Sequence, residues 1–550
     1  MLSAGGFQGK TVHRPGTQRK KEDTKKETGR EGHGNEEGES QTMEHKEYLV
    51  TGEEQKGFHN HVDYCIGTGR MGLALQKEYM EQLALVQKEI GFSHIRGHGL
   101  FSDDMGIYRE YTDENGTVHA EYCFTYLDLV MDSYRSVGLK PFLELGFMPE
   151  KLASGDQTVF YWKGHVTPPK SYDGWYDMVQ ATLRHLMERY GADEVVTWPL
   201  EVWNEPNLPG FWKDADMEEY FVLFERTLKA VKEVDIRFRV GGPAICGVED
   251  EKWIRCFLEF CREKQLPLDF VTRHHYTTEV PQTEGHYGYT ILRDPETGFE
   301  NLQTTRDIVD SFEEYRGMEI HITEFNTSYV PNCPLHDTNQ NAAYIAQQLS
   351  RLGDVNESYS YWTFGDIFEE FGVPFAPFHG GFGLVANGCI PKPTFWTFRF
   401  FKQLTGTCVH RSEDAVITRQ EDGSFRGVVW NSSCRRTGRK LELSFQISCG
   451  NAEDRPYFLL TETVDENTCN PLKLWHDMGE TTHLMQEQKS LLQEAAKPAI
   501  ASRRVDVAQV EGKGVLKFLL PVEEYGVIYF ELKPICEGGD RGYDYDRVLG

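Results

Sequence analysis

The stretch Leu200-Glu-Val-Trp-Asn-Glu-Pro-Asn207 decides the fold assignment. Its first residues form a short apolar run of strand type, and Asn204-Glu205-Pro206 ends the run because proline cannot continue a hydrogen-bonded ladder. This pattern predicts a strand that carries a carboxylate at its end. A second stretch, Glu319-Ile-His-Ile-Thr-Glu-Phe-Asn326, has the same construction and places Glu324 near its end.

Short apolar segments of this type recur along the chain, and a helical segment follows each of them. The expected strands begin near Tyr64, Ser93, Pro141, Leu200, Phe238, Asp269, Glu319 and Glu357. Consecutive strand and helix units in this number favour a closed barrel over an open sheet. We therefore predict an α/β protein with a (β/α)8 TIM barrel over residues 58–405.

The chain on either side of the barrel has a different texture. Residues 406–540 contain short alternating segments that predict a C-terminal antiparallel β-sandwich, with a loop and helix excursion from Leu474 to Lys497. Residues 1–45 hold almost no aliphatic side chain and are expected to form a disordered N-terminal tail. Met43 stands just before the protein-like sequence, so we expect natural translation to begin there and the first 42 residues to be dispensable.

Composition excludes several classes of partner. The 550 residues carry a formal net charge of −28, which argues against nucleic acid or an anionic membrane, because phosphate binding needs clustered lysine and arginine. No apolar run approaches the roughly 18 residues of a membrane span, and no secretory signal is visible. The 12 cysteines form no CxxC pair, and Cys246, Cys256 and Cys261 lack zinc-site spacing. Reduced thiols and a cytoplasmic location are expected.

Glu205 and Glu324 are the candidate catalytic pair. Strand ends at one face of a barrel build the active site, so these acids should enter a common mouth and divide acid and base work, as glycosidic bond cleavage requires. Trp203 and Pro206 offer Glu205 an apolar setting that would raise its pKa and favour a proton donor. Asn326 and Tyr329 are expected to hold Glu324 as an ionised nucleophile.

A resemblance to a known family joins these motifs. The chain resembles the β-xylosidases of glycoside hydrolase family 39 from about Tyr64 to about Leu532. The motifs that carry the resemblance are Trp203-Asn-Glu-Pro-Asn207, Ile322-Thr-Glu-Phe-Asn-Thr-Ser-Tyr329, Cys65-Ile-Gly-Thr-Gly-Arg70, Arg96-Gly-His-Gly-Leu100, Ser102-Asp-Asp104 and Phe378-His-Gly-Gly-Phe-Gly383. One departure is Gly365, where family members more often have serine.

The resemblance implies a retaining, exo-acting β-D-xylosidase that cleaves short β-1,4-xylo-oligosaccharides without metal or organic cofactor. It implies Glu205 as acid/base and Glu324 as nucleophile. It also implies a homo-oligomer, since family members are often tetramers. The sugar pocket that it implies is lined by His98, Asn204, His275, Trp362, and Glu369 or Glu370.

Two other functions stay open. An α-L-iduronidase shares the family and the Asn-Glu-Pro strand, but it would need a cationic clamp for the uronic carboxylate. A carbohydrate-binding protein on an inactivated barrel would belong to a different class, and the presence of both glutamates argues against it.

Two further signals favour plain structural roles. Gly67-Thr-Gly-Arg-Met-Gly72 fits a dinucleotide-binding pattern, yet the acid expected after the second strand is missing. His274 and His275 have no HExxH motif or second cluster beside them, so hydrogen bonding to substrate or to a neighbouring strand is favoured over metal binding.

Overall fold

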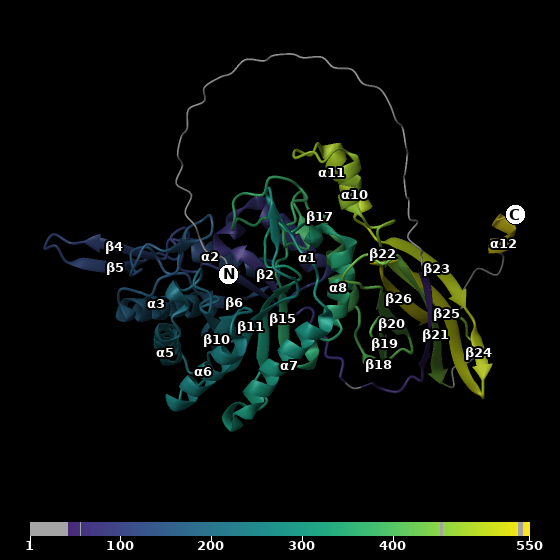
Figure 1. Cartoon of the computed structure of the whole chain (residues 1–550), viewed down its shortest axis with the longest axis horizontal. Helices are drawn as coiled ribbons and strands as arrows, with labels where there is room; N and C mark the ends of the chain where they lie inside the picture. The colour runs from purple at the N-terminus through teal and green to yellow at the C-terminus, as the bar shows by residue number, and fades with distance from the viewer. Residues whose placement is uncertain (1–41, 56, 451–454, 537–542, 550) are drawn as a thin grey trace, which may run out of the picture. The chain divides into compact units, whose positions relative to one another are not determined.

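The computed structural model describes residues 42–55, 57–450, 455–536 and 543–549. Eight parallel strands close into a barrel in the order in which they occur along the chain (Figure 1). The barrel strands are β2 (Cys65–Arg70), β3 (His94–His98), β6 (Lys140–Leu145), β9 (Leu200–Val202), β10 (Val240–Ile245), β11 (Phe270–Tyr276), β14 (Ile320–Asn326) and β15 (Ser358–Tyr361). The predicted barrel is confirmed, and each expected strand coincides with one of these.

Helices surround the barrel strands. They are α1 (Lys77–Glu89), α2 (Thr125–Ser136), α3 (Tyr172–Tyr190), α4 (Ala192–Val195), α5 (Met217–Val234), α6 (Asp250–Glu263), α7 (Pro295–Ser311), α8 (Asn339–Leu349) and α9 (Pro393–Lys402). Local sequence sets several boundaries: α3 starts where the Ser171 side chain accepts from Gly174 N, and it stops at Gly191, whose φ is 91°. None of the described helices is long and apolar enough to cross a membrane.

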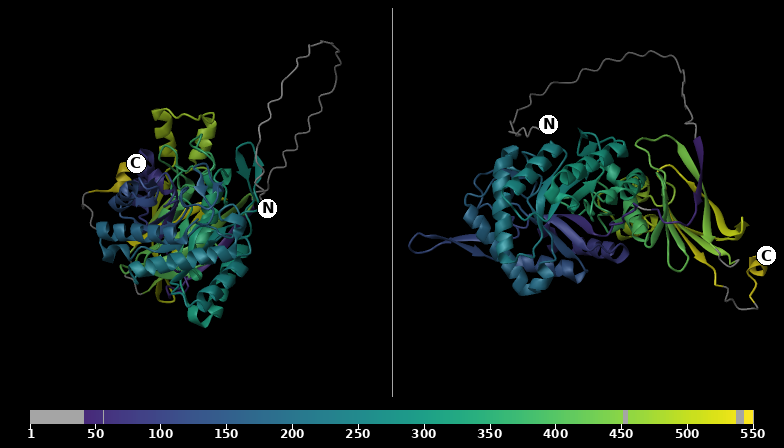
Figure 2. Two further views of the ribbon diagram at one scale, coloured as in Figure 1. Left: turned by 90° about the vertical axis from the view of Figure 1, so that its left-hand side faces the viewer. Right: turned by 90° about the horizontal axis from the view of Figure 1, so that it is seen from below.

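Short hairpins extend the loops between these elements. They are β4 (Tyr108–Thr112) with β5 (Val118–Tyr122), β7 (Thr158–Val159) with β8 (Gly164–His165), β12 (Gln282–Glu284) with β13 (Tyr287–Tyr289), and β16 (Val385–Ala386) with β17 (Ile390–Pro391). The β4–β5 hairpin projects away from the barrel in Figure 1 and in the right-hand view of Figure 2.

The second domain has two sheets, as predicted for a sandwich. One contains β1 (Thr42–Val50), β21 (Arg439–Gly450), β25 (Lys513–Val522) and β24 (Val507–Val510). The other contains β18 (Thr407–Arg411), β19 (Ala415–Arg419), β20 (Phe425–Trp430), β26 (Val527–Pro534), β22 (Tyr457–Val464) and β23 (Ala499–Val505). The excursion forms α10 (Pro471–Asp477) and α11 (Gln486–Ala495), and α12 (Tyr545–Leu549) follows the last strand.

Strand β1 corrects two expectations. Residues 42–45, assigned to the disordered tail, are part of this strand, whereas residues 1–41 lie outside the described residues. β1 pairs in parallel with β21, so the sheet is not purely antiparallel. Val50 is buried and Leu49 is exposed, because only one face of this edge strand meets the core. Most residues of the strand are polar, which explains why the sequence looks like a tail.

The sandwich packs directly on the barrel helices. Trp430 of β20 and Tyr529 of β26 belong to the same buried cluster as the barrel core. The Tyr529 ring stacks on Phe400 of α9 with centroids 5.7 Å apart. A separate core between the two sheets, which includes Phe445 and Phe530, holds the sandwich together. The barrel and the six-stranded sheet therefore share one continuous apolar interior.

Candidate active site

The two predicted catalytic glutamates lie at strand ends on one face of the barrel. Glu205 follows β9 by three residues, with φ of 47°, and its N–H donates to Ala244 O over 2.9 Å. Glu324 lies within β14, which pairs in parallel with β11. Both side chains are buried, with 7% and 4% of the residue exposed. The barrel thus brings together two acids that are more than a hundred positions apart in sequence.

Both carboxylates lie close to the same imidazole nitrogen, which limits the distance between them. Nδ1 of His274 lies 2.8 Å from Oε1 of Glu205 and 3.4 Å from Oε2 of Glu324. These two oxygens can be no further apart than the sum of those distances. This bound on one pair of oxygens is compatible with the roughly 5 to 5.5 Å between carboxyl groups that is typical of retaining glycosidases.

Glu324 is surrounded by hydrogen-bond donors. Arg96 donates from Nη1 to Oε1 over 2.7 Å, and the Tyr276 hydroxyl donates to Oε2 over 2.7 Å. This arrangement suits a carboxylate anion. The expected donors are wrong: Asn326 donates to the backbone oxygen of Trp362, and the Tyr329 ring packs beside Tyr276. Both donors to Glu324 come from other strands, Arg96 from β3 and Tyr276 from β11.

Glu205 is set up as the protonated partner. Burial is the largest cause that raises its pKa well above the usual value, and the negative charge of Glu324 is the second. The pKa of Glu205 is therefore raised, as expected. The sequence argument named only the apolar setting as a cause, and the structure adds the charge of Glu324. A pair whose environments differ in this way can divide acid and nucleophile roles.

Arg96 organises the floor of the site. Its buried guanidinium contacts Glu201 at 2.6 Å and Glu144 at 3.0 Å in addition to Glu324. Nη2 also donates to Oδ1 of Asn204 over 2.8 Å, which orients the amide of that predicted pocket residue. Three buried carboxylates around one cation leave no positive charge free for an anionic ligand.

The predicted sugar pocket is partly assembled beside this pair. His98 Nδ1 hydrogen-bonds Glu144 over 2.6 Å, and its ring lies 4.6 Å from the Trp362 ring, centroid to centroid. Glu370 is buried, with Oε1 3.8 Å from Nε2 of His98. Burial, followed by the charge of Glu324, raises the pKa of Glu370 well above the usual value. His98, Asn204, Trp362 and Glu370 are therefore brought together.

Two predicted pocket residues lie elsewhere. His275 points away from the barrel interior, where its Nε2 contacts Oε1 of Gln348 on α8 at 3.1 Å. Its neighbours His274 and Tyr276 face the site instead, because side chains alternate along β11. Glu369 pairs with Arg70 at 2.6 Å, which leaves Glu370 as the member of the acid pair that faces the pocket.

Sequence reasoning did not assign four residues of the site, which are Arg96, Glu144, Glu201 and Tyr276. For His274 it left open a hydrogen bond to substrate or to a neighbouring strand, and the structure places this side chain between the two glutamates. The sequence held a signal for these residues, because charged or polar side chains in otherwise apolar barrel strands need hydrogen-bond or ionic partners. Residues two positions apart on a strand share a face, so Arg96 lies on the same face as His98, and His274 on the same face as Tyr276.

The glycine pattern near the start of the barrel serves packing. A Cβ at Gly67 would lie 2.5 Å from Cε3 of Trp362, and one at Gly69 would lie 2.9 Å from Cδ2 of Phe368. These glycines let β2 approach the aromatic side of the pocket.

Two groups of side chains have metal-ligating atoms close together, Glu205 with Cys246 and His274, and Asp103 with Glu150 and His165.

Comparison with known proteins agrees with this geometry. Residues 48–512 match the model for glycosyl hydrolases family 39. The chain belongs to this family. A β-xylosidase of Geobacillus stearothermophilus is 50% identical over 422 residues, covering 76% of this chain and 82% of the relative. A β-xylosidase of Caldicellulosiruptor saccharolyticus is 36% identical over 431 residues, covering 77% of this chain and 86% of the relative.

Solved structures of the family have the same architecture. The crystal structure described as a monomeric β-xylosidase from Caulobacter crescentus CB15 matches with a TM-score of 0.79 and 30% identity, covering 89% of this chain and 100% of that one. The predicted family membership, glycoside hydrolase class and barrel-plus-sandwich fold are confirmed.

Proposed function

We propose that this family 39 enzyme is a retaining, exo-acting β-D-xylosidase that releases xylose from short β-1,4-xylo-oligosaccharides. The observation that carries the proposal is the placement of Glu205 and Glu324 against one nitrogen of His274, at 2.8 and 3.4 Å. The names and coverage of the two β-xylosidase relatives support the choice of sugar.

The two glutamates act in two steps. In the first, Glu324 attacks the anomeric carbon while Glu205 donates its proton to the glycosidic oxygen, so the aglycone leaves as an alcohol and a glycosyl ester forms. In the second, Glu205 takes a proton from water, which attacks the anomeric carbon and frees Glu324. The hydrogen bonds from Arg96 and Tyr276 hold Glu324 in position for the attack.

The charge of the pocket favours a neutral sugar over a uronic acid. Glu144 and Glu324 lie at the site, and the Arg96 guanidinium is already shared by them and by Glu201. A uronic carboxylate would meet repulsion and no available cation among the residues described above. An α-L-iduronidase is therefore disfavoured. A non-catalytic binding protein does not require a buried pair of acids in different environments, so this pair also argues against that alternative.

A panel of nitrophenyl glycosides tests the proposal. We expect the β-D-xyloside to be hydrolysed faster than the α-L-arabinoside, the β-D-glucoside and an α-L-iduronide, with release of β-xylose as the first product in an NMR time course. Fastest turnover of the iduronide, or α-xylose as first product, would contradict it. Absence of any hydrolysis would favour the binding protein.

Cellular location and assembly complete the proposal. The 12 cysteines are all free thiols, which supports a reducing compartment such as the cytoplasm. The family resemblance supports a homotetramer, whereas the Caulobacter crescentus relative is described as monomeric. Multi-angle light scattering of the purified chain decides between the two states, and fractionation of the source cells decides the location.

A further inference from the structure

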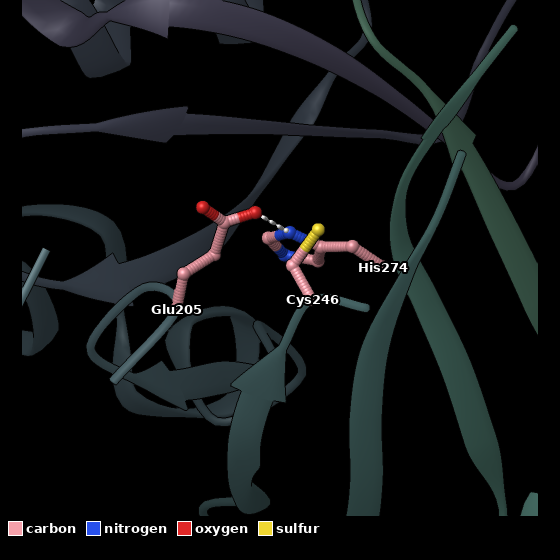
Figure 3. A group of neighbouring side chains, drawn as sticks. All are labelled: Glu205, Cys246 and His274. Carbon is pink, nitrogen blue, oxygen red and sulfur yellow. Dashed lines mark hydrogen bonds and ion pairs between the residues drawn. The ribbon is translucent and has the colours of Figure 1, made fainter. Parts of the chain in front are cut away.

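Three strand ends place a carboxylate, a thiol and an imidazole around one point. Glu205 follows β9, Cys246 follows β10 and His274 lies in β11, and their side chains converge in Figure 3. One oxygen, the sulfur and one ring nitrogen all lie within 4.8 Å of one another. The thiol has no role in the two-step hydrolysis, so its presence beside the acid/base carboxylate calls for a separate explanation.

We propose that Glu205, Cys246 and His274 form an inhibitory binding site for a thiophilic divalent cation such as Zn²⁺ or Cd²⁺. Sulfur and nitrogen ligands favour these cations over Mg²⁺ and Ca²⁺, which prefer oxygen. A tetrahedral zinc ion with bonds of about 2.0 to 2.3 Å needs its ligand atoms roughly 3.3 to 3.8 Å apart. The present atoms approach that spacing from strands whose positions the barrel fixes.

A second carboxylate lies beside this point. Oε2 of Glu324 lies 3.4 Å from the same His274 nitrogen and can face the cation from the fourth side. The cation would replace the hydrogen bond between His274 Nδ1 and Glu205 Oε1, now 2.8 Å long. Cys246 is partly exposed as a residue, and burial raises the pKa of its thiol well above the usual value, so a cation must displace the thiol proton.

One feature limits the affinity. Nε2 of His274 is buried without a hydrogen-bond partner among the described residues, whereas histidines in high-affinity metal sites donate this N–H to an acceptor. We therefore assign reversible inhibition rather than a resident structural ion. The bound cation occupies Glu205 and removes the proton donor, and this consequence rests on the proposed function.

The first test is inhibition of the full-length enzyme. Chelator-treated protein is assayed on nitrophenyl β-D-xyloside with increasing free Zn²⁺ or Cd²⁺ in a non-coordinating buffer. We expect reversible inhibition that EDTA removes and that equal Mg²⁺ does not cause. Cys246→Ala should weaken it by at least about tenfold, since even a lost outer partner of a metal ligand costs roughly 10- to 100-fold in affinity. Cys256→Ala, on α6, serves as the control and should respond like the wild type.

The second test reads binding without activity. Co²⁺ added to the wild-type protein should give a thiolate-to-cobalt charge-transfer band, which Cys246→Ala lacks and Cys256→Ala keeps. Equal inhibition of both alanine variants, or no band in the wild type, overturns the metal site. A band in a protein that hydrolyses no glycoside keeps the metal site and refutes the proposed function. Circular dichroism checks that each variant is folded.

Discussion

The Arg96 guanidinium donates a hydrogen bond from Nη1 to Oε1 of Glu324 over 2.7 Å, and both side chains are buried. Arg96 comes from β3 and Glu324 from β14, two strands that are not neighbours in the barrel. The contact therefore crosses the barrel interior. It positions the proposed nucleophile and offsets the negative charge of its carboxylate, which is buried away from water.

Glu324→Ala is expected to abolish turnover of nitrophenyl β-D-xyloside, because no carboxylate remains to form the glycosyl ester. The loss should reach roughly four to six orders of magnitude in kcat, the scale seen when members of a nucleophilic triad are removed. Azide should restore release of nitrophenol and give the α-xylosyl azide, identified by NMR. A β-azide from this variant would contradict the assignment.

Glu205→Ala is expected to lose the proton donor but keep the nucleophile. Hydrolysis of xylobiose should fall about 10²- to 10⁴-fold, whereas a dinitrophenyl β-D-xyloside, whose leaving group needs no proton, should still be cleaved in the first step. Azide should then give the β-xylosyl azide. In the wild type, kcat/KM on xylobiose should fall as pH rises through the elevated pKa of Glu205, and this alkaline limb should disappear in the variant.

Arg96→Met is expected to destabilise the whole barrel. It leaves Glu144, Glu201 and Glu324 buried without their cation, and such a loss costs about 3 to 5 kcal/mol in the free energy of unfolding. Urea titration measures the change. The control is Arg135→Met, which removes a partly exposed pair with Glu194 and should cost less than about 1 kcal/mol. Equal effects of the two substitutions would count against Arg96 as the organising charge.

Glu369 and Glu370 form a matched pair of substitutions. Glu370→Ala should raise KM about three- to tenfold, because a neutral hydrogen bond contributes roughly 0.5 to 1.5 kcal/mol. Glu370→Gln should restore KM, since burial and the charge of Glu324 raise the pKa of this carboxyl and so favour the neutral form that glutamine resembles. Glu369→Ala breaks only the contacts with Arg70 and Gln76 and should leave KM unchanged. The opposite pattern would place Glu369 in the pocket after all.

His275 should contribute to acid sensitivity rather than to substrate binding. Burial lowers its pKa to about 4 from the usual 6.5, so the unfolded chain takes up a proton at a pH where the folded protein does not. Its contribution to stability is complete above pH 6.5 and is lost as pH falls toward 4. The slope is about 1.4 kcal/mol per pH unit for one such group.

His275→Gln tests this contribution through urea unfolding at pH 7 and pH 5. The wild type should lose more unfolding free energy between the two values than the variant, and KM should be the same in both. An unchanged difference between the two pH values would show that His275 is not buried in the neutral form. A raised KM would return it to the sugar pocket.

The order of strands and helices was open to prediction because it depends on local patterns. Apolar segments such as those at Leu200 and Glu319 recur with helical stretches between them, and this number of units closes a barrel. Strand β1 escaped prediction because its partner β21 lies about four hundred positions further along the chain, and because most of its own residues are polar. Local composition cannot reveal such a partner.

By itself, the sequence determined that Glu205 and Glu324 sit at the ends of barrel strands, because the acid follows a short apolar run in each case. Only the tertiary structure decided which neighbours share the site. It chose His274 over His275 and Glu370 over Glu369, because the orientation of a side chain on a strand or loop depends on what packs against each face. It also brought Arg96 across the barrel to Glu324, a contact that depends on closure of the sheet.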